Sequence, residues 1–162
     1  MKTSLFNDTI ENIRAAADII RDGGLVAFPT ETVYGLGADA LNSEAVSKVY
    51  AAKGRPSDNP MIVHIAETSE LAKLTDDISS DMRALMDAFW PGPMTMIVRR
   101  KDIVPDVTTG GLDTVGVRLP SSEVARTLIR ESGCPIAAPS ANISGRPSPT
   151  TAEHVIHDLY GR

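Results

Sequence analysis

The chain has 162 residues, of which 42% are hydrophobic and 23% charged, so it is long enough for one domain with a buried core. Its net charge of -5 argues against a protein that coats nucleic acid through its overall field, although it does not exclude a local basic surface. The single cysteine, Cys134, excludes an internal disulfide and a cysteine-based zinc site. No segment approaches the roughly 20 apolar residues of a membrane-spanning helix, and the expected location is the cytoplasm.

The elements predicted from the sequence alternate between helices and strands. The first helix is expected over 8–22, with Asp8 as its cap, Glu11 in the capping-box position and Gly23-Gly24 at its end. Further helices are expected at 43–53, 68–74, 79–89, 122–131 and from about Thr151, and extended segments at 25–28, 30–36 with a glycine-containing turn, 61–65, 94–98, 115–119 and 135–138. The alternation predicts a mixed α/β (α+β) domain in which helices pack on a sheet.

The common nucleotide-binding and hydrolase signatures are missing from the sequence. There is no G-x-x-x-x-G-K-[ST] phosphate loop, and Gly35-Leu36-Gly37 lacks the third glycine of a dinucleotide fingerprint. Neither G-x-S-x-G nor H-E-x-x-H occurs. If the protein uses a nucleotide, it binds it through a less common arrangement.

The segment Lys53-Gly54-Arg55-Pro56-Ser57-Asp58-Asn59-Pro60 places two cations on either side of a glycine at a helix end. Lys53 and Arg55 would both reach one anionic ligand if the backbone were extended, and Gly54 would permit a close approach. Such a pair suits phosphates, because arginine binds them bidentately and lysine acts as a point charge. A solvated basic helix end, favoured by the helix dipole, explains the composition about as well.

A second polar segment follows the strand predicted at 135–138. It offers Ser140, Asn142, Ser144 and Ser148 as hydrogen-bonding groups. Ligands of open sheets bind beyond strand ends, which is where this segment would lie. Taken alone, the pattern is more typical of an ordinary polar turn.

Arg118 and His64 each interrupt an apolar strand. A guanidinium in such a position needs either a carboxylate of the protein or an anionic ligand. A lone strand histidine is more often a satisfied core residue than a ligand contact. Thr30-Glu31-Thr32 interrupts a hydrophobic stretch and would form either the floor of a pocket or a turn.

Other polar residues are assigned no catalytic role. His154 and His157 are not expected to bind a metal, since no further ligand lies near them in sequence. Cys134 is expected to pack. Arg99-Arg100-Lys101 is expected to end a strand in solvent, with RNA contact as the less favoured alternative.

Taken together, the segments resemble the YrdC/TsaC family of threonylcarbamoyl-AMP synthases. The resemblance rests on G-L-V-A-F-P-T-E-T-V-Y-G-L-G at 24–37, K-G-R-P at 53–56, N-P at 59–60, His64, W-P-G-P-M-T at 90–95, V-R-L-P at 117–120 and P-S-A-N-I-S-G at 139–145. It implies a twisted, mostly open mixed sheet flanked by helices, with a concave basic face. It also implies one YrdC-like domain over 1–162 that lacks the C-terminal segment of the family, which carries a Ser-Thr pair and a further basic residue.

The resemblance implies that the protein makes threonylcarbamoyl-AMP and pyrophosphate from L-threonine, bicarbonate and ATP, for threonylcarbamoyladenosine in tRNAs that read ANN codons. Lys53 and Arg55 would be catalytic. The implied ATP-binding residues are Lys53, Arg55, Asn59, Thr114, Ser140, Asn142 and Ser148, and the implied threonine-binding residues are Thr32, His64, Arg118 and the backbone of Ala138. ATP would be a substrate that brings Mg²⁺, with no metal held by the protein.

The same resemblance implies tRNA or double-stranded RNA and other tRNA-threonylcarbamoylation proteins as partners, and no membrane. Because a threonine carbamate attacks the α-phosphate directly, no protein nucleophile is needed, and catalysis reduces to positioning and charge neutralisation. Two alternatives remain open: an RNA-binding module without catalysis, and a carbamoyl-transfer domain of the hydrogenase-maturation type that uses carbamoyl phosphate.

Overall fold

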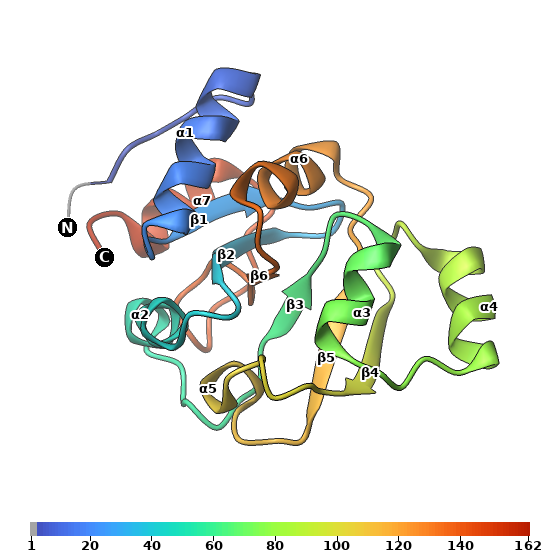
Figure 1. Ribbon diagram of the computed structural model, residues 1–162. Helices are drawn as coiled ribbons and strands as arrows, with labels where there is room; N and C mark the ends of the chain where they lie inside the picture. The colour runs from blue at the N-terminus through green and yellow to red at the C-terminus, as the bar shows by residue number, and fades with distance from the viewer. Residues whose placement is uncertain (1–2) are drawn as a thin grey trace.

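The computed structural model describes residues 3–162, in which helices and strands alternate as predicted (Figure 1). The elements are α1 (Ile10–Arg21), β1 (Val26–Pro29), β2 (Tyr34–Asp39), α2 (Ser43–Lys53), β3 (Ile62–His64), the 3-10 helix η1 (Thr68–Glu70), α3 (Leu71–Leu74), α4 (Ser80–Phe89), β4 (Thr95–Arg99), α5 (Asp106–Thr109), β5 (Thr114–Arg118), α6 (Glu123–Ser132), β6 (Ile136–Ala137) and α7 (Ala152–Leu159). The short helix α5 was not predicted. Among the described residues, no helix is long and apolar enough to cross a membrane.

The strands form one six-stranded sheet in the order β1-β2-β6-β3-β5-β4. Only β3 and β5 run parallel; the other neighbouring strands are antiparallel. The predicted mixed sheet with helices packed on it is therefore confirmed. The basic character predicted for its concave face stays a prediction.

The register of β3, β5 and β4 puts His64, Arg118 and Thr95 in one row across the sheet. Because side chains alternate between the faces of a strand, Val63 and Val117 point to the opposite face, where both are fully buried in the larger core. On the face that carries His64, Ile97 of β4 is 69% exposed, so no helix covers that end.

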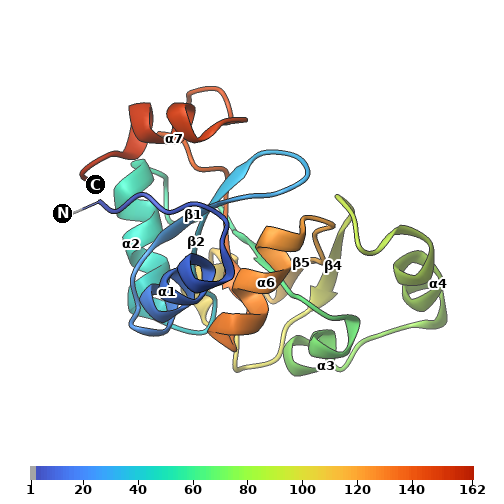
Figure 2. The same cartoon turned by 90° about the horizontal axis from the view of Figure 1, so that it is seen from above.

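A smaller core covers the other end of the same face. Ile20 of α1 and Ile129 of α6 pack there against Phe28 and Ile136 of the sheet. Figure 2 shows α1 and α6 lying side by side over this end, while α3 and α4 lie at the far end near β4. The covered and uncovered ends meet along β6 and β3, which is where the polar segments of the sequence converge.

Two local predictions are wrong. The helix α1 is preceded by Thr9 rather than Asp8 as its cap, and no side chain caps it, so there is no capping box. The turn after β1 spans 30–33 and contains no glycine; Gly35, the glycine of the predicted segment 30–36, lies inside β2 instead, as does Gly37. A Cβ added at Gly37 would come within 2.6 Å of Ile136 and 2.7 Å of Phe28, so close packing of the smaller core requires this glycine.

Candidate functional site

A cavity of about 270 Å³ opens where the covered and uncovered ends of the sheet meet. Its walls come from the 30–35 turn, the segment after α2, the strands β3 and β5, and the loop after β6. They comprise Thr30, Val33, Gly35, Arg55, Pro60, Met61, Ile62, His64, Arg118, Ala138, Pro139 and Ser140. The fold thus brings the polar segments of the sequence to one place.

Arg118 lies at the end of β5 with only 8% of its surface exposed. Its Nη2 lies 2.7 Å from Oε1 of Glu31 and donates to Oγ1 of Thr32 at 3.2 Å. The buried Nε has no hydrogen-bond partner among residues 3–162. The sequence posed two alternatives for Arg118, a carboxylate of the protein or an anionic ligand. Arg118 lines the cavity, is paired with a protein carboxylate and still keeps an unused donor, so the two alternatives are compatible.

His64 is 3% exposed, and its ring meets that of Phe28 edge to face at 6.2 Å between centroids. Burial and the nearby Arg118 lower the pKa of His64 to about 4, so its imidazole is neutral at pH 7. Within the described part of the chain, Nδ1 has no hydrogen-bond partner. His64 is therefore not a fully satisfied core histidine, and its ring offers a neutral polar atom beside Arg118.

Arg55 reaches the cavity because α2 ends at a left-handed glycine. Gly54 has φ 61°, and the N–H of Arg55 donates to the carbonyl of Tyr50 at 3.0 Å. No protein atom lies within 4 Å of a Cβ added at Gly54, so its conformation, rather than a close backbone approach, requires glycine there. The Arg55 side chain donates to the carbonyls of Asn59 at 3.3 Å and Pro60 at 3.1 Å.

Lys53 does not line the cavity that Arg55 lines. It is 1% exposed, and its Nζ donates to the carbonyl oxygens of Ser140 and, at 2.6 Å, Asn142. Burial, with a smaller effect of Arg55, lowers the pKa of Lys53 to about 8. The sequence required an extended backbone for Lys53 and Arg55 both to reach one anion directly. Because Gly54 between them is left-handed, that condition is not met.

The loop that carries Ser140 is fixed by several buried contacts. Asn142 donates through Nδ2 to the carbonyls of Ile143 and Arg146, both at 2.9 Å. From α7, the carboxylate of Asp158 accepts from the N–H of Ile143 at 3.1 Å and from Arg146 at 2.7 Å. The sequence did not single out Asp158, because only the docking of α7 on the loop gives it this role.

Several predicted site residues do not line the cavity. Asn59 is exposed, and its carbonyl accepts from the Tyr50 hydroxyl at 2.9 Å. Thr114 begins β5, at the end opposite Arg118, and Ser148 is exposed in the loop. Thr32 contacts Arg118 but does not itself line the cavity. Their proposed roles in binding nucleotide or threonine stay predictions.

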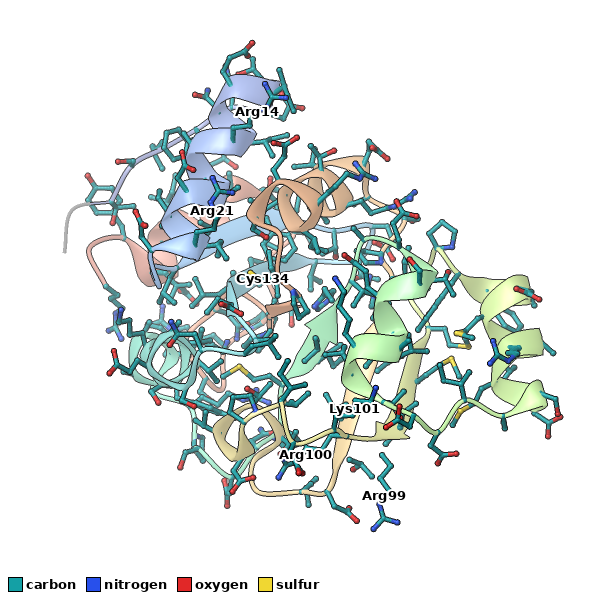
Figure 3. The ribbon with its side chains drawn as sticks, viewed as in Figure 1. Arg14, Arg21, Arg99, Arg100, Lys101 and Cys134 are labelled. Carbon is teal, nitrogen blue, oxygen red and sulfur yellow. The ribbon has the colours of Figure 1, made fainter. Side chains whose placement is uncertain are left out.

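The basic side chains Arg99, Arg100 and Lys101, which were assigned no catalytic role, lie in ion pairs, and so do Arg14 and Arg21; Figure 3 labels these side chains. Arg99, Arg100 and Lys101 pair with Asp113, Asp106 and Asp76 respectively. Arg14 and Arg21 of α1 pair with Glu131 and Asp18. Within residues 3–162, no three His, Cys, Asp or Glu side chains gather as metal ligands.

Cys134 packs as predicted. Its thiol is half-buried, and burial raises its pKa to about 11, so the reactive thiolate is disfavoured. It has no part in the cavity lining.

Residues 18–162 match the family model Sua5_yciO_yrdC, whose description reads "Telomere recombination". The chain belongs to this Sua5/YciO/YrdC family. It is 57% identical over 150 residues to the threonylcarbamoyl-AMP synthase of Pyrococcus abyssi and 58% identical over 151 residues to that of Bacillus subtilis. Each alignment covers 93% of this chain but only 44% of the relative, so the chain spans less than half the length of these proteins.

Solved structures give the same grouping. The structure of P. abyssi Sua5 complexed with L-threonine has a TM-score of 0.93 and 56% identity, covering 94% of this chain and 45% of that one. Full-length HypF in its phosphate- and nucleotide-bound form has a TM-score of 0.78 and 25% identity, covering 91% of this chain and 23% of HypF. The predicted family and YrdC-like fold are confirmed.

Proposed function

We propose that this chain is a threonylcarbamoyl-AMP synthase domain, which forms threonylcarbamoyl-AMP and pyrophosphate from L-threonine, bicarbonate and ATP. The observation that carries the proposal is a cavity with unused buried polar atoms on Arg118 and His64 in a chain 57% identical to a named synthase. A relative of 56% identity that binds L-threonine supports the choice of amino acid.

In the proposed reaction, the threonine amine takes up carbon dioxide or bicarbonate as a carbamate. A carbamate oxygen then attacks the α-phosphorus of ATP; the new P–O bond forms as the bond to pyrophosphate breaks. No bond to the protein forms, so the protein contributes orientation and charge stabilisation. Mg²⁺ would arrive on the triphosphate as part of the substrate.

Arg118 would bind the threonine carboxylate, because it is the cation of the cavity with a buried donor left over among the described residues. Thr32, His64 and the backbone of Ala138 would complete the threonine site. Arg55 would neutralise charge on the phosphates from the opposite wall.

On the nucleotide side, the proposed contacts beyond Arg55 are Asn59, Thr114, Ser140, Asn142 and Ser148. Lys53 would act on the phosphates through the loop whose carbonyls its ammonium binds, or directly if that loop moves. The single-domain assignment for 1–162 is part of the proposal.

The product would donate its threonylcarbamoyl group to the adenosine beside the anticodon of tRNAs that read ANN codons. That step implies tRNA and other tRNA-modification proteins as partners. Because ATP and tRNA meet in the cytoplasm, we expect the protein to act there.

The decisive experiment incubates the protein with ATP, bicarbonate and threonine, and detects threonylcarbamoyl-AMP by mass spectrometry together with pyrophosphate. The longer B. subtilis synthase, under the same conditions, is the positive control. Lys53→Ala and Arg55→Ala should each nearly abolish threonine-dependent pyrophosphate release. Near-normal release in both variants would refute the assigned phosphate site.

The likeness to HypF supports one alternative, a carbamoyl-transfer domain. Replacing threonine and bicarbonate by carbamoyl phosphate in the same assay separates the two: pyrophosphate released only with carbamoyl phosphate would favour the alternative. Salt-sensitive RNA binding without any ATP turnover would instead favour a non-catalytic RNA-binding module.

A further inference from the structure

We propose that Glu31 is a positioning residue that holds Nη2 of Arg118, so that the donors of the guanidinium that Glu31 does not occupy are left for the carboxylate of the amino-acid substrate. The inference rests on the proposed function, in which Arg118 binds that carboxylate. It assigns to Glu31 a role that the sequence left open between a pocket floor and a turn.

The first argument is the placement of the two side chains. Oε1 of Glu31 lies 2.7 Å from Nη2 of Arg118, and the side chains are 20% and 10% exposed. Arg118 lines the cavity, whereas Glu31 and Thr32 do not. Glu31 therefore holds Arg118 without itself occupying the cavity wall.

The second argument is a count of donors. Nη2 forms the ion pair with Glu31 and donates to Thr32, whereas Nη1 has no hydrogen-bond partner among the described residues. Nε has no partner among the described residues and is buried. Because the guanidinium is planar and rigid, anchoring Nη2 also fixes the direction of Nε. A carboxylate entering the cavity has Nη1 as a donor that Glu31 does not occupy.

The third argument is the rigidity of the 30–33 turn that carries Glu31. The hydroxyl of Thr30 donates to the carbonyl of Val33 at 2.7 Å and accepts from the N–H groups of Thr32 at 3.2 Å and Val33 at 3.3 Å. The N–H of Thr30 closes the turn on the same carbonyl at 3.2 Å. A carboxylate held by such a turn is an anchor with few alternative positions.

The carboxylate of Glu31 stays ionised at neutral pH. Burial on its own would raise its pKa, but the hydrogen bond and charge of Arg118 together with backbone hydrogen bonds from Glu31 and Ser121 lower it by more, so the net shift is downward. The anchor is therefore charged under the conditions in which the substrate binds.

The test measures threonine binding by calorimetry for the unmodified protein, Glu31→Gln and Glu31→Ala, with threoninol, which lacks the carboxylate, as second probe. Losing a hydrogen bond to a charged group should weaken threonine binding about tenfold or more in Glu31→Ala. Glu31→Gln, which keeps an acceptor oxygen, should lose less. Threoninol and ATP binding should change little, since neither presents a carboxylate to Arg118.

Glu67→Ala is the matched control, because Glu67 also pairs with arginines, Arg126 and Arg130, but away from the cavity. It should bind threonine normally. Equal or tighter threonine binding by Glu31→Ala and Glu31→Gln would overturn the inference alone, since it would mean that Glu31 competes with the substrate. Failure of the unmodified protein to bind threonine would overturn the proposed function together with the inference.

Discussion

Lys53 and Arg118 are both buried cations, yet their surroundings differ in one respect. Lys53 donates to two loop carbonyls and is absent from the cavity wall. Arg118 lines the cavity and keeps a buried Nε without a partner in the described part of the chain. A buried polar group that is fully bonded holds the fold together, whereas one left unbonded costs free energy unless a ligand completes it.

The same comparison separates the two sides of the site. The loop after β6 is tied down by Lys53, Asn142 and Asp158, so its backbone is fixed before any ligand arrives. On the β3–β5 side, His64 and Arg118 line the cavity and present unused atoms, whereas the unused buried atom of the loop, Oδ1 of Asn142, belongs to a residue outside the cavity lining. We therefore expect substitutions on the β3–β5 side to change binding, and substitutions at the loop to change stability first.

The largest expected effect is that of Arg118→Ala on the proposed reaction. Removing a charged donor aimed at the substrate should lower threonine-dependent pyrophosphate release by about 10²–10³-fold. Steady-state assays at low threonine check this. Arg14→Ala, which removes an exposed arginine paired with Glu131, is the control and should be fully active. Unchanged release in Arg118→Ala would remove the distinction between the two cations.

The next effect is the acid sensitivity caused by His64. The pKa of His64 is about 4 in the folded protein and about 6.5 when unfolded, so between these values the unfolded chain binds more protons. The corresponding stability is fully present above pH 6.5 and is lost as pH falls to about 4, by up to about 3 kcal/mol. Urea unfolding at a series of pH values measures it.

His64→Gln is the matched variant for that experiment, because glutamine is polar but does not titrate. Its unfolding free energy should depend less steeply on pH between 6.5 and 4 than that of the unmodified protein. Parallel curves for the two proteins would show that His64 is not held neutral in the fold.

A smaller effect is expected from Lys53→Met, which keeps the length of the side chain but removes the donor to Ser140 and Asn142. The free energy of unfolding should fall by about 2 kcal/mol, and proteases should cut the 139–150 loop sooner. Lys48→Met is the control, because Lys48 donates to a single carbonyl, that of Gly23, at 2.7 Å. This substitution should lower the free energy of unfolding by less. An equal loss in both would contradict a special role of Lys53 in the loop.

The smallest effect is that of Gly54→Ala. A left-handed conformation costs a residue with a Cβ about 1 kcal/mol, so the free energy of unfolding should fall by about that amount. Arg55, which follows this glycine, should also lose its position at the cavity. Gly133→Ala, at another left-handed helix end with equal space, should lose the same stability but bind ATP normally. Normal ATP binding by Gly54→Ala would mean that Arg55 does not depend on this glycine.

Much of the fold was predictable from the sequence because it depends on local patterns. The apolar periods and turn residues predicted nearly every helix and strand, and glycine with its preceding lysine predicted the end of α2 at Lys53. The prediction was wrong where two equivalent local signals competed, as for Asp8 and Thr9 before α1. It was also wrong where a glycine served packing between strands, as for Gly35, because the sequence does not show which side chains will face it.

The candidate site was predictable only as a set of segments. The sequence by itself determined the residue types that a phosphate and a carboxylate require, and the order of motifs that places the chain in its family. Only the tertiary structure decided that Arg55 lines the cavity while Lys53 binds the loop carbonyls of Ser140 and Asn142, and that Glu31 pairs with Arg118. The physical reason is that the burial of a charged side chain, and the group it pairs with, depend on residues far away in sequence. Those residues become neighbours only when the strands assemble into the sheet.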